Sequence, residues 1–377
     1  MKSKTELRVA IIGGGIAGSS TAVALKSKGI RADVYEQAPA FTEVGAGIGV
    51  RPPSVRAINK WGLKEDLEKV SAESRYMEII AGDDQVLIRE TFPVLTDDKS
   101  EAYTRLIHRA DLLDTLIAHI PADQLHLNHR VTEVIDHGDY AEVKFENGKT
   151  IEADIVVAAD GIHSPIRRQV LGNQQKSVYS GYLAHRALIP YEDALGMHSE
   201  ENELRIYVDG DNSFYLLPIE HRRQVSVDIT VPGEFALRPE LTKEQIMDSM
   251  KGFGPTLQKI VENIKLEDIV SRPLSDLEPM DKWSTNTVTL IGDSAHAMLH
   301  NQGQGANMAI QDADVLAEAI AEAVAGTVTV AEALQKYEEQ RKPVTKLYQE
   351  LSRLFPTDQA KTAFPEKEYF EKKTVNN

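Results

Sequence analysis

The feature that most constrains the fold is a glycine cluster that directly follows the first apolar run of the chain. The segment reads VAIIGGGIAGSSTAVALKSKG (residues 9–29), and Gly13, Gly15 and Gly18 match the pattern G-x-G-x-x-G. A second apolar run, ADVYE, ends at Glu36, 18 residues beyond Gly18. A strand, a glycine turn, a helix and a second strand ending in a carboxylate are typical of a parallel unit that binds a dinucleotide.

The residue types indicate which dinucleotide this unit suits. Glycines let the backbone approach a pyrophosphate closely, and the following helix presents free N–H groups and the positive end of its dipole. A carboxylate at Glu36 suits the ribose hydroxyls of an unphosphorylated adenosine, as in FAD or NAD. The alternative is a glycine-rich turn that binds no ligand. The flanking apolar runs and the acidic residue favour the nucleotide interpretation.

A second glycine-rich loop lies late in the chain, within TLIGDSAHAMLHNQGQGANMAIQDADVLAEAIAEAV (residues 289–324). Asp293 follows a short apolar run, where a carboxylate can accept a hydrogen bond from a ligand hydroxyl. NQGQGAN (residues 301–307) precedes apolar residues at helical spacing. Free N–H groups at a helix N-terminus favour negative charge, such as that on the N1–C2=O edge of a reduced flavin. We therefore expect this loop to hold the flavin end of the same dinucleotide, with Asp293 on its ribityl or phosphate side.

The middle of the chain has a different pattern. ENGK (residues 146–149) predicts a hairpin turn, and residues 180–231 contain successive β runs that predict an antiparallel sheet. From Thr329 an amphipathic helix begins with the capping box TVAE. We predict an α/β fold in which a Rossmann-like FAD-binding domain is interleaved with an antiparallel-sheet substrate domain and followed by a long C-terminal helix. The expected boundaries are 1–75, 101–178 and 266–325 for the FAD-binding domain, 76–100 and 179–265 for the substrate domain, and 326–377 for the C-terminal helix and tail.

Composition narrows the class of partners. Lys and Arg number 42 and Asp and Glu number 58, so the net charge is −16. Nucleic acid and anionic membranes would repel such a surface. Cysteine is absent, which excludes disulfides and thiolate metal sites, and we predict no metal site. No unbroken apolar run indicates a membrane span. We expect a cytoplasmic protein that is a monomer or a homodimer.

Three motifs together resemble one enzyme family. They are GGGIAG with Glu36, ADIVVAADGIHSPIRR (residues 153–168) and GDSAHAMLHNQGQGANMAIQDA (residues 292–313). With these motifs the chain resembles the group A FAD-dependent aromatic hydroxylases, which are monooxygenases with the para-hydroxybenzoate hydroxylase fold. YSGYLAHRALI (residues 179–189) is most similar to the branch of salicylate and 6-hydroxynicotinate hydroxylases.

The resemblance implies that FAD is the bound cofactor and that NADPH or NADH binds transiently to reduce it. Oxygen would then add to the flavin as a C4a-hydroperoxide, and one oxygen atom would pass to a small aromatic or phenol-like substrate. That chemistry needs water to be excluded, so the antiparallel sheet is expected to cover the flavin. The residues expected to bind the cofactor are Gly13, Gly15, Gly18, Glu36, Gln37, Gly49, Arg109, Val131, Asp160, Gly161, Asp293, Gly303, Gly305, Ala306 and Asn307.

The expected substrate pocket is where the chain departs from the family. His300 occupies a position that is usually proline, and a histidine beside the flavin can act as a base for a phenolic hydroxyl. A loop histidine that faces solvent is an equal alternative. Tyr215 is a second catalytic candidate and shares one face of its predicted strand with Leu217. The residues expected to contact substrate are Arg51, His185, Tyr207, Leu217 and Asn301.

Other functions remain open at this level. The same fold suits a flavin monooxygenase that inactivates tetracycline-type antibiotics, and it suits a flavoprotein kept as a non-catalytic binding module. A flavin halogenase is disfavoured, because its tryptophan-rich motif is missing and the chain contains only Trp61 and Trp283. His163 and His296 fall within family motifs, and we interpret both as structural.

Overall fold

The computed structural model describes residues 7–41, 46–91, 101–197, 202–237, 239 and 242–354. One layer is a five-stranded parallel sheet in the order β18-β12-β1-β2-β8. Its strands are β1 (Val9–Ile12), β2 (Ala32–Tyr35), β8 (Leu125–His126), β12 (Ile155–Ala158) and β18 (Val288–Leu290). The central strands β1 and β12 are buried along their whole length, which is why they are unbroken apolar runs in the sequence.

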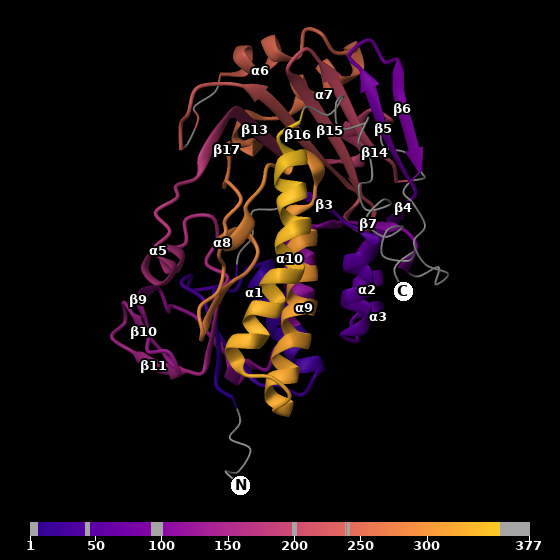
Figure 1. Cartoon of the computed structure of the whole chain (residues 1–377). Coiled ribbons are helices and arrows are strands. Elements are labelled where there is room, and N and C mark those ends of the chain that lie inside the picture. The colour runs from indigo at the N-terminus through magenta and orange to yellow at the C-terminus, as the bar shows by residue number, and fades with distance from the viewer. Residues whose placement is uncertain are drawn as a thin grey trace.

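Helices from distant parts of the chain pack against one another beside this sheet (Figure 1). They are α1 (Ile16–Ser27), α2 (Pro52–Lys60), α3 (Lys64–Lys69), α4 (Arg109–Ala118), α8 (Asp293–His296), α9 (Gly305–Ala325) and α10 (Val330–Ser352), with 3-10 turns η2 (Ala122–Gln124) and η6 (His300–Gln302). α5 (Pro165–Leu171) packs mainly against residues 131–136. α9 packs between α1 and α10. The expected β–α–β unit and the capping box at Thr329 and Glu332 are both confirmed.

A second layer is a seven-stranded sheet in the order β17-β13-β16-β15-β14-β5-β6. Its strands are β5 (Tyr76–Ala81), β6 (Val86–Thr91), β13 (Val178–Pro190), β14 (Leu204–Asp209), β15 (Asn212–Ile219), β16 (Gln224–Pro232) and β17 (Val270–Asp276). The antiparallel sheet expected over residues 180–231 is confirmed, and β5 joins it parallel to β14.

β17 corrects one expected boundary. We assigned the chain from residue 266 onwards to the FAD-binding domain, but Val270–Asp276 pairs with β13 in the seven-stranded sheet. The physical reason is that β13 would otherwise be an edge strand with unpaired N–H and C=O groups along its length. The elements of the two layers therefore alternate along the chain beyond this point as well.

Two helices, α6 (Lys243–Ser249) and α7 (Pro255–Asn263), cover the outer face of the seven-stranded sheet (Figure 1). Ile246 and Leu257 from these helices share one buried core with Phe214 and Val227 from the strands. The 3-10 turns η3 (Tyr191–Ala194), η4 (Glu220–Arg222) and η5 (Leu266–Asp268) connect elements of this half. The opposite face of the sheet turns towards the rest of the molecule.

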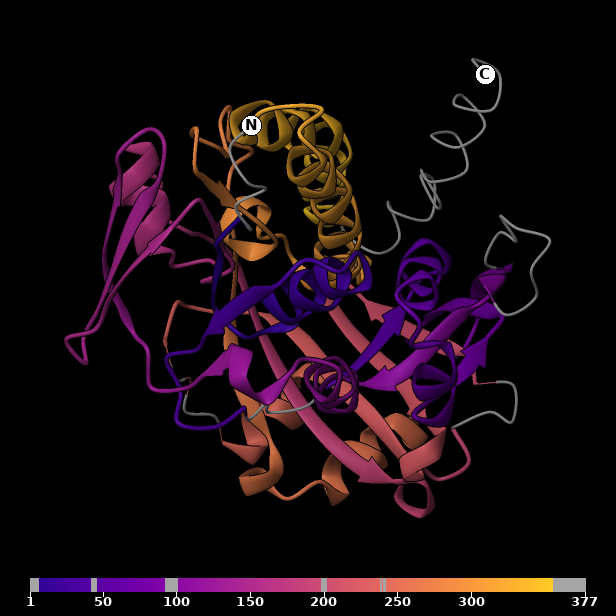
Figure 2. The same ribbon diagram turned by 90° about the horizontal axis from the view of Figure 1, so that it is seen from below.

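Two three-stranded sheets complete the described part of the chain (Figure 2). β9 (Val131–Asp136), β10 (Ala141–Phe145) and β11 (Thr150–Ala153) form a meander, which confirms the hairpin at ENGK. β3 (Gly47–Val50), β7 (Thr104–His108) and β4 (Ser71–Ser74) form the other sheet, and β3 and β7 contact β15. This small sheet links the two layers. None of the helices in the described ranges is long and apolar enough to span a membrane.

Candidate active site

The first glycine turn has the geometry that a pyrophosphate site requires. Gly13 has a φ of +108°, and a Cβ there would lie 2.3 Å from the carbonyl oxygen of Ala159. A Cβ at Gly18 would lie 1.9 Å from the carbonyl oxygen of Gly13. Gly15, which directly precedes α1, has open space where a Cβ would be. Two glycines therefore let the turn pack closely against its surroundings, and the third leaves the helix N-terminus accessible to a ligand.

Glu36 lies at the carboxyl end of β2, beside this turn. Its carboxylate accepts hydrogen bonds from the N–H groups of Gly14 (2.7 Å) and Ala38 (2.8 Å). These bonds fix the carboxylate where the ribose of a bound dinucleotide is expected. The carbonyl of Glu36 accepts a 2.8 Å hydrogen bond from the N–H of His129, so the chain leading to Val131 passes beside it. Gln37 follows with an exposed side chain.

Asp160 and Gly161 follow β12, the neighbour of β1, and therefore lie at the same edge of the parallel sheet as the glycine turn. One carboxylate oxygen of Asp160 accepts a 3.4 Å hydrogen bond from the N–H of Ile166, and the other is buried without a partner among the described residues. Burial raises the pKa of Asp160. Gly161 has a φ of +79°, a conformation that favours glycine.

The second glycine loop meets the first through α1 and α9. A Cβ at Gly292 would lie 2.8 Å from the Cβ of Ala17, in the first turn of α1, and 3.4 Å from that of Ala309 in α9. Asp293 is exposed, and a Cβ at Gly305 would lie 4.0 Å from its carboxylate. The N-terminal turns of the two helices are therefore close together, as one extended ligand that contacts both would require.

A cavity of about 410 Å³ lies between the second loop and the inner face of the seven-stranded sheet. Eleven of the residues singled out from the sequence line it: Gly49, Arg51, Arg109, Tyr215, Leu217, Asp293, His300, Asn301, Gly303, Gly305 and Ala306. The loop side carries expected cofactor residues together with His300 and Asn301, and the seven-stranded sheet carries Tyr215 and Leu217. The structure thus brings both groups to one cavity.

Two expected substrate residues do not line this cavity. Side chains alternate across a strand, and Arg186 and Ile206 face the cavity, so their neighbours His185 and Tyr207 face away from it. Tyr207 packs in the core beneath α6 and α7, and His185 is buried with a 2.9 Å hydrogen bond to Ser271. The expected roles of His185 and Tyr207 are therefore corrected. A shift of one residue along a strand exchanges the two faces.

Asn307 has a different position from the one expected of a cofactor ligand. Its side-chain N–H groups donate to the carbonyls of Gly49 and Gly303, both at 2.9 Å, and its carbonyl accepts from the N–H of Arg51 at 2.7 Å. Asn307 does not line the cavity. The side chain instead connects the start of α9 to β3, and it holds two cavity walls together.

Sequence reasoning missed an ionisable cluster on the sheet side of the cavity. Arg186 and Asp228 form an ion pair of 2.5 Å, and the hydroxyl of Thr230 donates to Asp228 at 2.9 Å. Nε2 of His300 lies 3.1 Å from the Thr230 hydroxyl and 3.7 Å from Asp228. The ring of Tyr215 lies edge-on to that of His300, with 5.6 Å between the ring centroids.

The missed cluster had a signal in the sequence. In QVSVDITVP, the sequence of β16, the polar residues Ser226, Asp228 and Thr230 alternate with apolar ones, and the structure buries both faces of that strand. A buried polar stripe requires partners, which are supplied here by Arg186 and His300. Those partners lie far away in the sequence, so the stripe alone does not identify them.

Burial determines the protonation of this cluster. It lowers the pKa of His300 to about 4, because the charged imidazolium loses its hydration. Burial also raises the pKa of the Tyr215 hydroxyl. Burial alone would raise the pKa of Asp228, but Arg186 and His300 hold it below its usual range. At neutral pH the cluster therefore contains an ionised Asp228, a neutral His300 and a protonated Tyr215.

His296 has the structural role that we expected. Its Nε2 lies 2.5 Å from Asp312, whose other oxygen accepts a 2.6 Å hydrogen bond from Arg341 of α10. All three side chains are buried. They connect α8, α9 and α10 directly behind the loop that carries Asp293. His163 is exposed on the surface.

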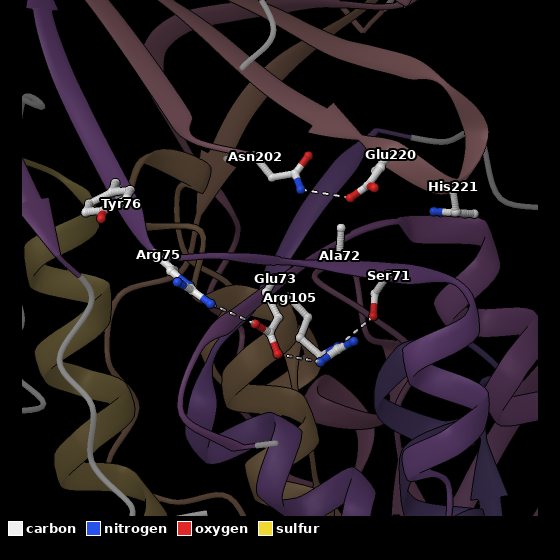
Figure 3. A pocket seen from close by; sticks show the side chains of 9 residues that line it. All are labelled: Ser71, Ala72, Glu73, Arg75, Tyr76, Arg105, Asn202, Glu220 and His221. Carbon is white, nitrogen blue, oxygen red and sulfur yellow. Dashed lines mark hydrogen bonds and ion pairs between the residues drawn. The ribbon is translucent and has the colours of Figure 1, made fainter. Parts of the chain in front are cut away.

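A second cavity, of about 640 Å³, lies on the other side of β7 (Figure 3). Arg105 of β7 lines it, whereas its neighbours Thr104 and Leu106 line the first cavity. The polar side chains of the second cavity pair with one another: Glu73 lies between Arg75 and Arg105, and Asn202 donates to Glu220. Because these groups already satisfy each other, the first cavity is the better candidate for an active site.

Comparison with known proteins agrees with this geometry. A salicylate hydroxylase of Pseudomonas putida is 30% identical over 369 residues, which cover 90% of this chain and 83% of that protein. A 3-amino-4-hydroxybenzoate 2-monooxygenase of Streptomyces platensis is 33% identical over 347 residues, with coverages of 90% and 85%. The crystal structure of Klebsiella pneumoniae HpxO complexed with FAD and uric acid superposes with a TM-score of 0.84 at 25% identity, covering 94% of this chain and 89% of that one.

These similarities and the two glycine loops define an FAD-dependent monooxygenase of the aromatic hydroxylase type. The family model described as the FAD binding domain matches residues 6–352, so the chain belongs to that family. The residues present fit FAD, because Gly15 leaves its helix N-terminus clear, Glu36 is held at the ribose position and a second helix N-terminus opens beside Asp293.

Proposed function

We propose that this enzyme uses NADPH or NADH and O₂ to hydroxylate a small aromatic or phenol-like compound. The observation that carries the proposal is the cavity of about 410 Å³, which lies between the cofactor loops and a polar patch of the sheet. Bound FAD supplies electron transfer from the nicotinamide and the activation of oxygen. The names of the relatives, salicylate hydroxylase and 3-amino-4-hydroxybenzoate 2-monooxygenase, support a hydroxylated aromatic ring as substrate.

The residues of the chain divide into two tasks in this proposal. Gly15, Glu36, Asp293 and the first turn of α9 bind and orient FAD. The sheet side supplies an apolar wall that keeps water away from the reacting atoms. That wall consists of Met77, Ile79, Leu204, Ile206 and Leu217.

The charge of the cavity also supports an acidic substrate. Four arginines line it, namely Arg51, Arg109, Arg186 and Arg272, together with two aspartates, Asp228 and Asp293. The cavity is therefore locally cationic, although the whole chain has a net charge of −16. Such a field favours a cofactor phosphate and an aromatic compound that carries, or develops, negative charge.

The experiment that tests the proposal is NADPH and NADH oxidation by the FAD-loaded enzyme, with oxygen uptake and peroxide release followed in the same sample. The compounds are hydroxybenzoates, other phenols, hydroxylated N-heterocycles and tetracyclines, and ¹⁸O₂ is supplied to label the product. We expect one phenol or hydroxylated heterocycle to accelerate oxidation, to suppress peroxide release and to gain one ¹⁸O atom.

Other outcomes would replace the proposal. Acceleration and labelling with a tetracycline alone would favour the antibiotic-inactivating alternative. Bound FAD that neither nicotinamide reduces would favour the non-catalytic flavoprotein. Turnover that always ends as peroxide, with no labelled product, would remove the hydroxylase reaction.

A further inference from the structure

The hydrogen bonds around Thr230 determine which nitrogen of His300 carries the proton. The Thr230 hydroxyl has a single hydrogen, and it donates that hydrogen to Asp228 at 2.9 Å. An ionised carboxylate only accepts, so the direction of this bond is fixed. The same hydroxyl can then only accept from His300, whose Nε2 lies 3.1 Å away. In the neutral ring, Nε2 therefore carries the proton and Nδ1 carries a free lone pair.

Two polar atoms at this wall of the cavity lack hydrogen bonds. Nδ1 of His300 and the hydroxyl of Tyr215 are both buried, and neither makes a hydrogen bond of good geometry with the described residues, although the side chain of Ser213 lies beside the tyrosine hydroxyl. Both side chains line the cavity, and their rings are in edge-on contact. Nδ1 is an acceptor and the tyrosine hydroxyl is a donor at neutral pH. A substrate hydroxyl, which both donates and accepts, matches this pair.

We propose that His300 takes the proton of the substrate hydroxyl on Nδ1, and that Thr230 and Asp228 are positioning residues that keep Nδ1 unprotonated for this step. The proton moves from the hydroxyl oxygen to Nδ1, which leaves a phenolate and an imidazolium, and no electrons are exchanged. The inference rests on the proposed function for its substrate class, a ring hydroxyl that enters in its neutral form. A phenolate ring is richer in electrons and therefore reacts more readily with an electrophilic oxygen.

The charged groups around His300 support this direction of transfer. Asp228, 3.7 Å from Nε2, stabilises the imidazolium once it forms, and Arg186 across the same strand pair offsets part of that effect. Burial is the largest influence on His300 and lowers its pKa to about 4, so the ring is neutral at neutral pH but is a weak base, and the transfer depends on Asp228 and the new phenolate to stabilise the imidazolium. Tyr215, whose pKa burial raises, remains protonated and can donate to the phenolate.

The first test measures the tautomer and needs no substrate. FAD-bound protein labelled with ¹⁵N-histidine is examined by NMR at pH 7, and the signal of His300 is the one lost in His300→Gln. We expect a neutral ring protonated on Nε2 in the wild type, and a mixture of tautomers in Thr230→Val. A wild-type ring that is protonated on Nδ1, or that is an imidazolium at pH 7, would overturn the proposal.

The second test follows proton acceptance with 4-nitrophenol, whose ionised form has its own absorption band. Difference spectra of FAD-bound enzyme are recorded at a pH below the solution pKa of the probe. We expect the bound probe to be ionised in the wild type and neutral in His300→Gln. His185→Gln is the matched control, because His185 lies in the sheet that carries Thr230, is buried with a pKa also lowered to about 4, and does not line the cavity. Ionisation that fails in the wild type, or persists in His300→Gln, contradicts the proposal.

Turnover measurements distinguish a failure of the role of His300 from a failure of the proposed function on which that role rests. With the phenol that most accelerates NAD(P)H oxidation, His300→Gln is expected to lower kcat about 100-fold, the contribution of one general base, and Thr230→Val by less. If no compound is hydroxylated while the tautomer and the ionisation are as expected, the proposed function fails and the assignment of His300 stands. Equal kcat in His300→Gln and the wild type would overturn the assignment itself.

Discussion

Gly13 and Gly15 lie two residues apart in one turn, but the structure requires glycine at them for different reasons. Gly13 needs a positive φ, and a side chain there would collide with the backbone of Ala159. Gly15 has an ordinary φ of −69° and open space around it. The first glycine is therefore required by the fold, whereas the second is required only by the approach of a ligand.

Substituting alanine for each glycine distinguishes the requirement of the fold from the requirement of the ligand. Gly15→Ala is expected to leave the thermal unfolding of the FAD-free protein unchanged and to weaken FAD binding at least about tenfold, which corresponds to roughly 1.4 kcal/mol. Gly13→Ala is expected to lower the unfolding temperature itself. FAD affinity is measured by fluorescence titration. An FAD-free Gly15→Ala protein that melts earlier would show that this residue also serves the fold.

The hydroxyl of Tyr215 is expected to lower the stability of the protein while it supports turnover. This hydroxyl is buried beside Ser213 without a hydrogen bond of good geometry, and such a group costs about 1–3 kcal/mol. Tyr215→Phe removes the hydroxyl and keeps the ring contact with His300, so we expect the free energy of unfolding of the ligand-free protein to rise by about 1 kcal/mol. Turnover of a phenol is expected to fall. Urea unfolding checks the first effect, and a lower free energy of unfolding would mean that the hydroxyl has a structural partner.

At the scale of elements, three helices converge on one buried carboxylate. Asp312 of α9 accepts from Arg341 of α10, lies against His296 of α8, and accepts a 3.3 Å hydrogen bond from the N–H of Gly292. The two cofactor loops meet at that glycine. The C-terminal helix therefore supports the flavin side of the cavity through Asp312, in addition to the contacts that Gln349 and Ser352 make with the same loop.

Asp312→Asn should be strongly destabilising, because it leaves the buried guanidinium of Arg341 without its counter-charge. We expect a loss of about 3–5 kcal/mol in the free energy of unfolding, measured in urea. Thr329→Ala is the control on the same helix, since it removes only the cap of α10 and should cost about 1 kcal/mol. Similar losses for the two variants would mean that the buried charge has little part in stability.

How well the sequence predicts a feature depends on how far apart along the chain the interacting residues lie. The β–α–β unit, the hairpin at residues 146–149 and the cap at Thr329 are local patterns, and all are confirmed. The pairing of Arg186 with Asp228 requires the register of β13 against β16, and the contact of His300 with Thr230 requires the docking of a loop on that sheet. Neither follows from a short-range pattern, so His185 was assigned to the wrong face and Asp228 was missed.

At the scale of the whole molecule, ion pairs fasten the layers together. Asp111 of α4 pairs with His221 (2.5 Å) and Arg222 of η4. α4 directly follows β7, and η4 connects β15 to β16, so these ion pairs join the small sheet to the seven-stranded sheet. Burial opposes ionisation of Asp111, but Arg222 and His221 outweigh it and hold its pKa below the usual range. The pKa values of Asp312 and Asp228 are lowered in the same manner by their cationic neighbours.

These lowered pKa values predict how stability responds to acid. A carboxylate with a lower pKa in the folded state stabilises the protein fully above its unfolded pKa of about 4, and that contribution is lost as the pH falls through the folded value. We expect the unfolding temperature to begin to fall below about pH 6.5, where histidines in the unfolded chain take up protons but the buried His185 and His300 do not, and to fall further below about pH 4. Asp111→Asn should be less stable at pH 7 and less sensitive to acid, as followed by circular dichroism. An Asp111→Asn variant that loses stability below about pH 4 as steeply as the wild type would indicate that this carboxylate has little part in the response to acid.

The order of strands in the parallel sheet has a consequence for folding during synthesis of the chain. β1 pairs with β12, and β12 pairs with β18, so residues near 10 and near 290 belong to one sheet. On a ribosome the glycine turn emerges well before the strand and loop that complete the flavin site, because all the residues between them have to be made first. FAD therefore cannot make its full set of contacts with a chain that still lacks β18 and the second glycine loop. The sheet edge stays incomplete until β18 has emerged, which makes that interval the one in which a chaperone has most to protect.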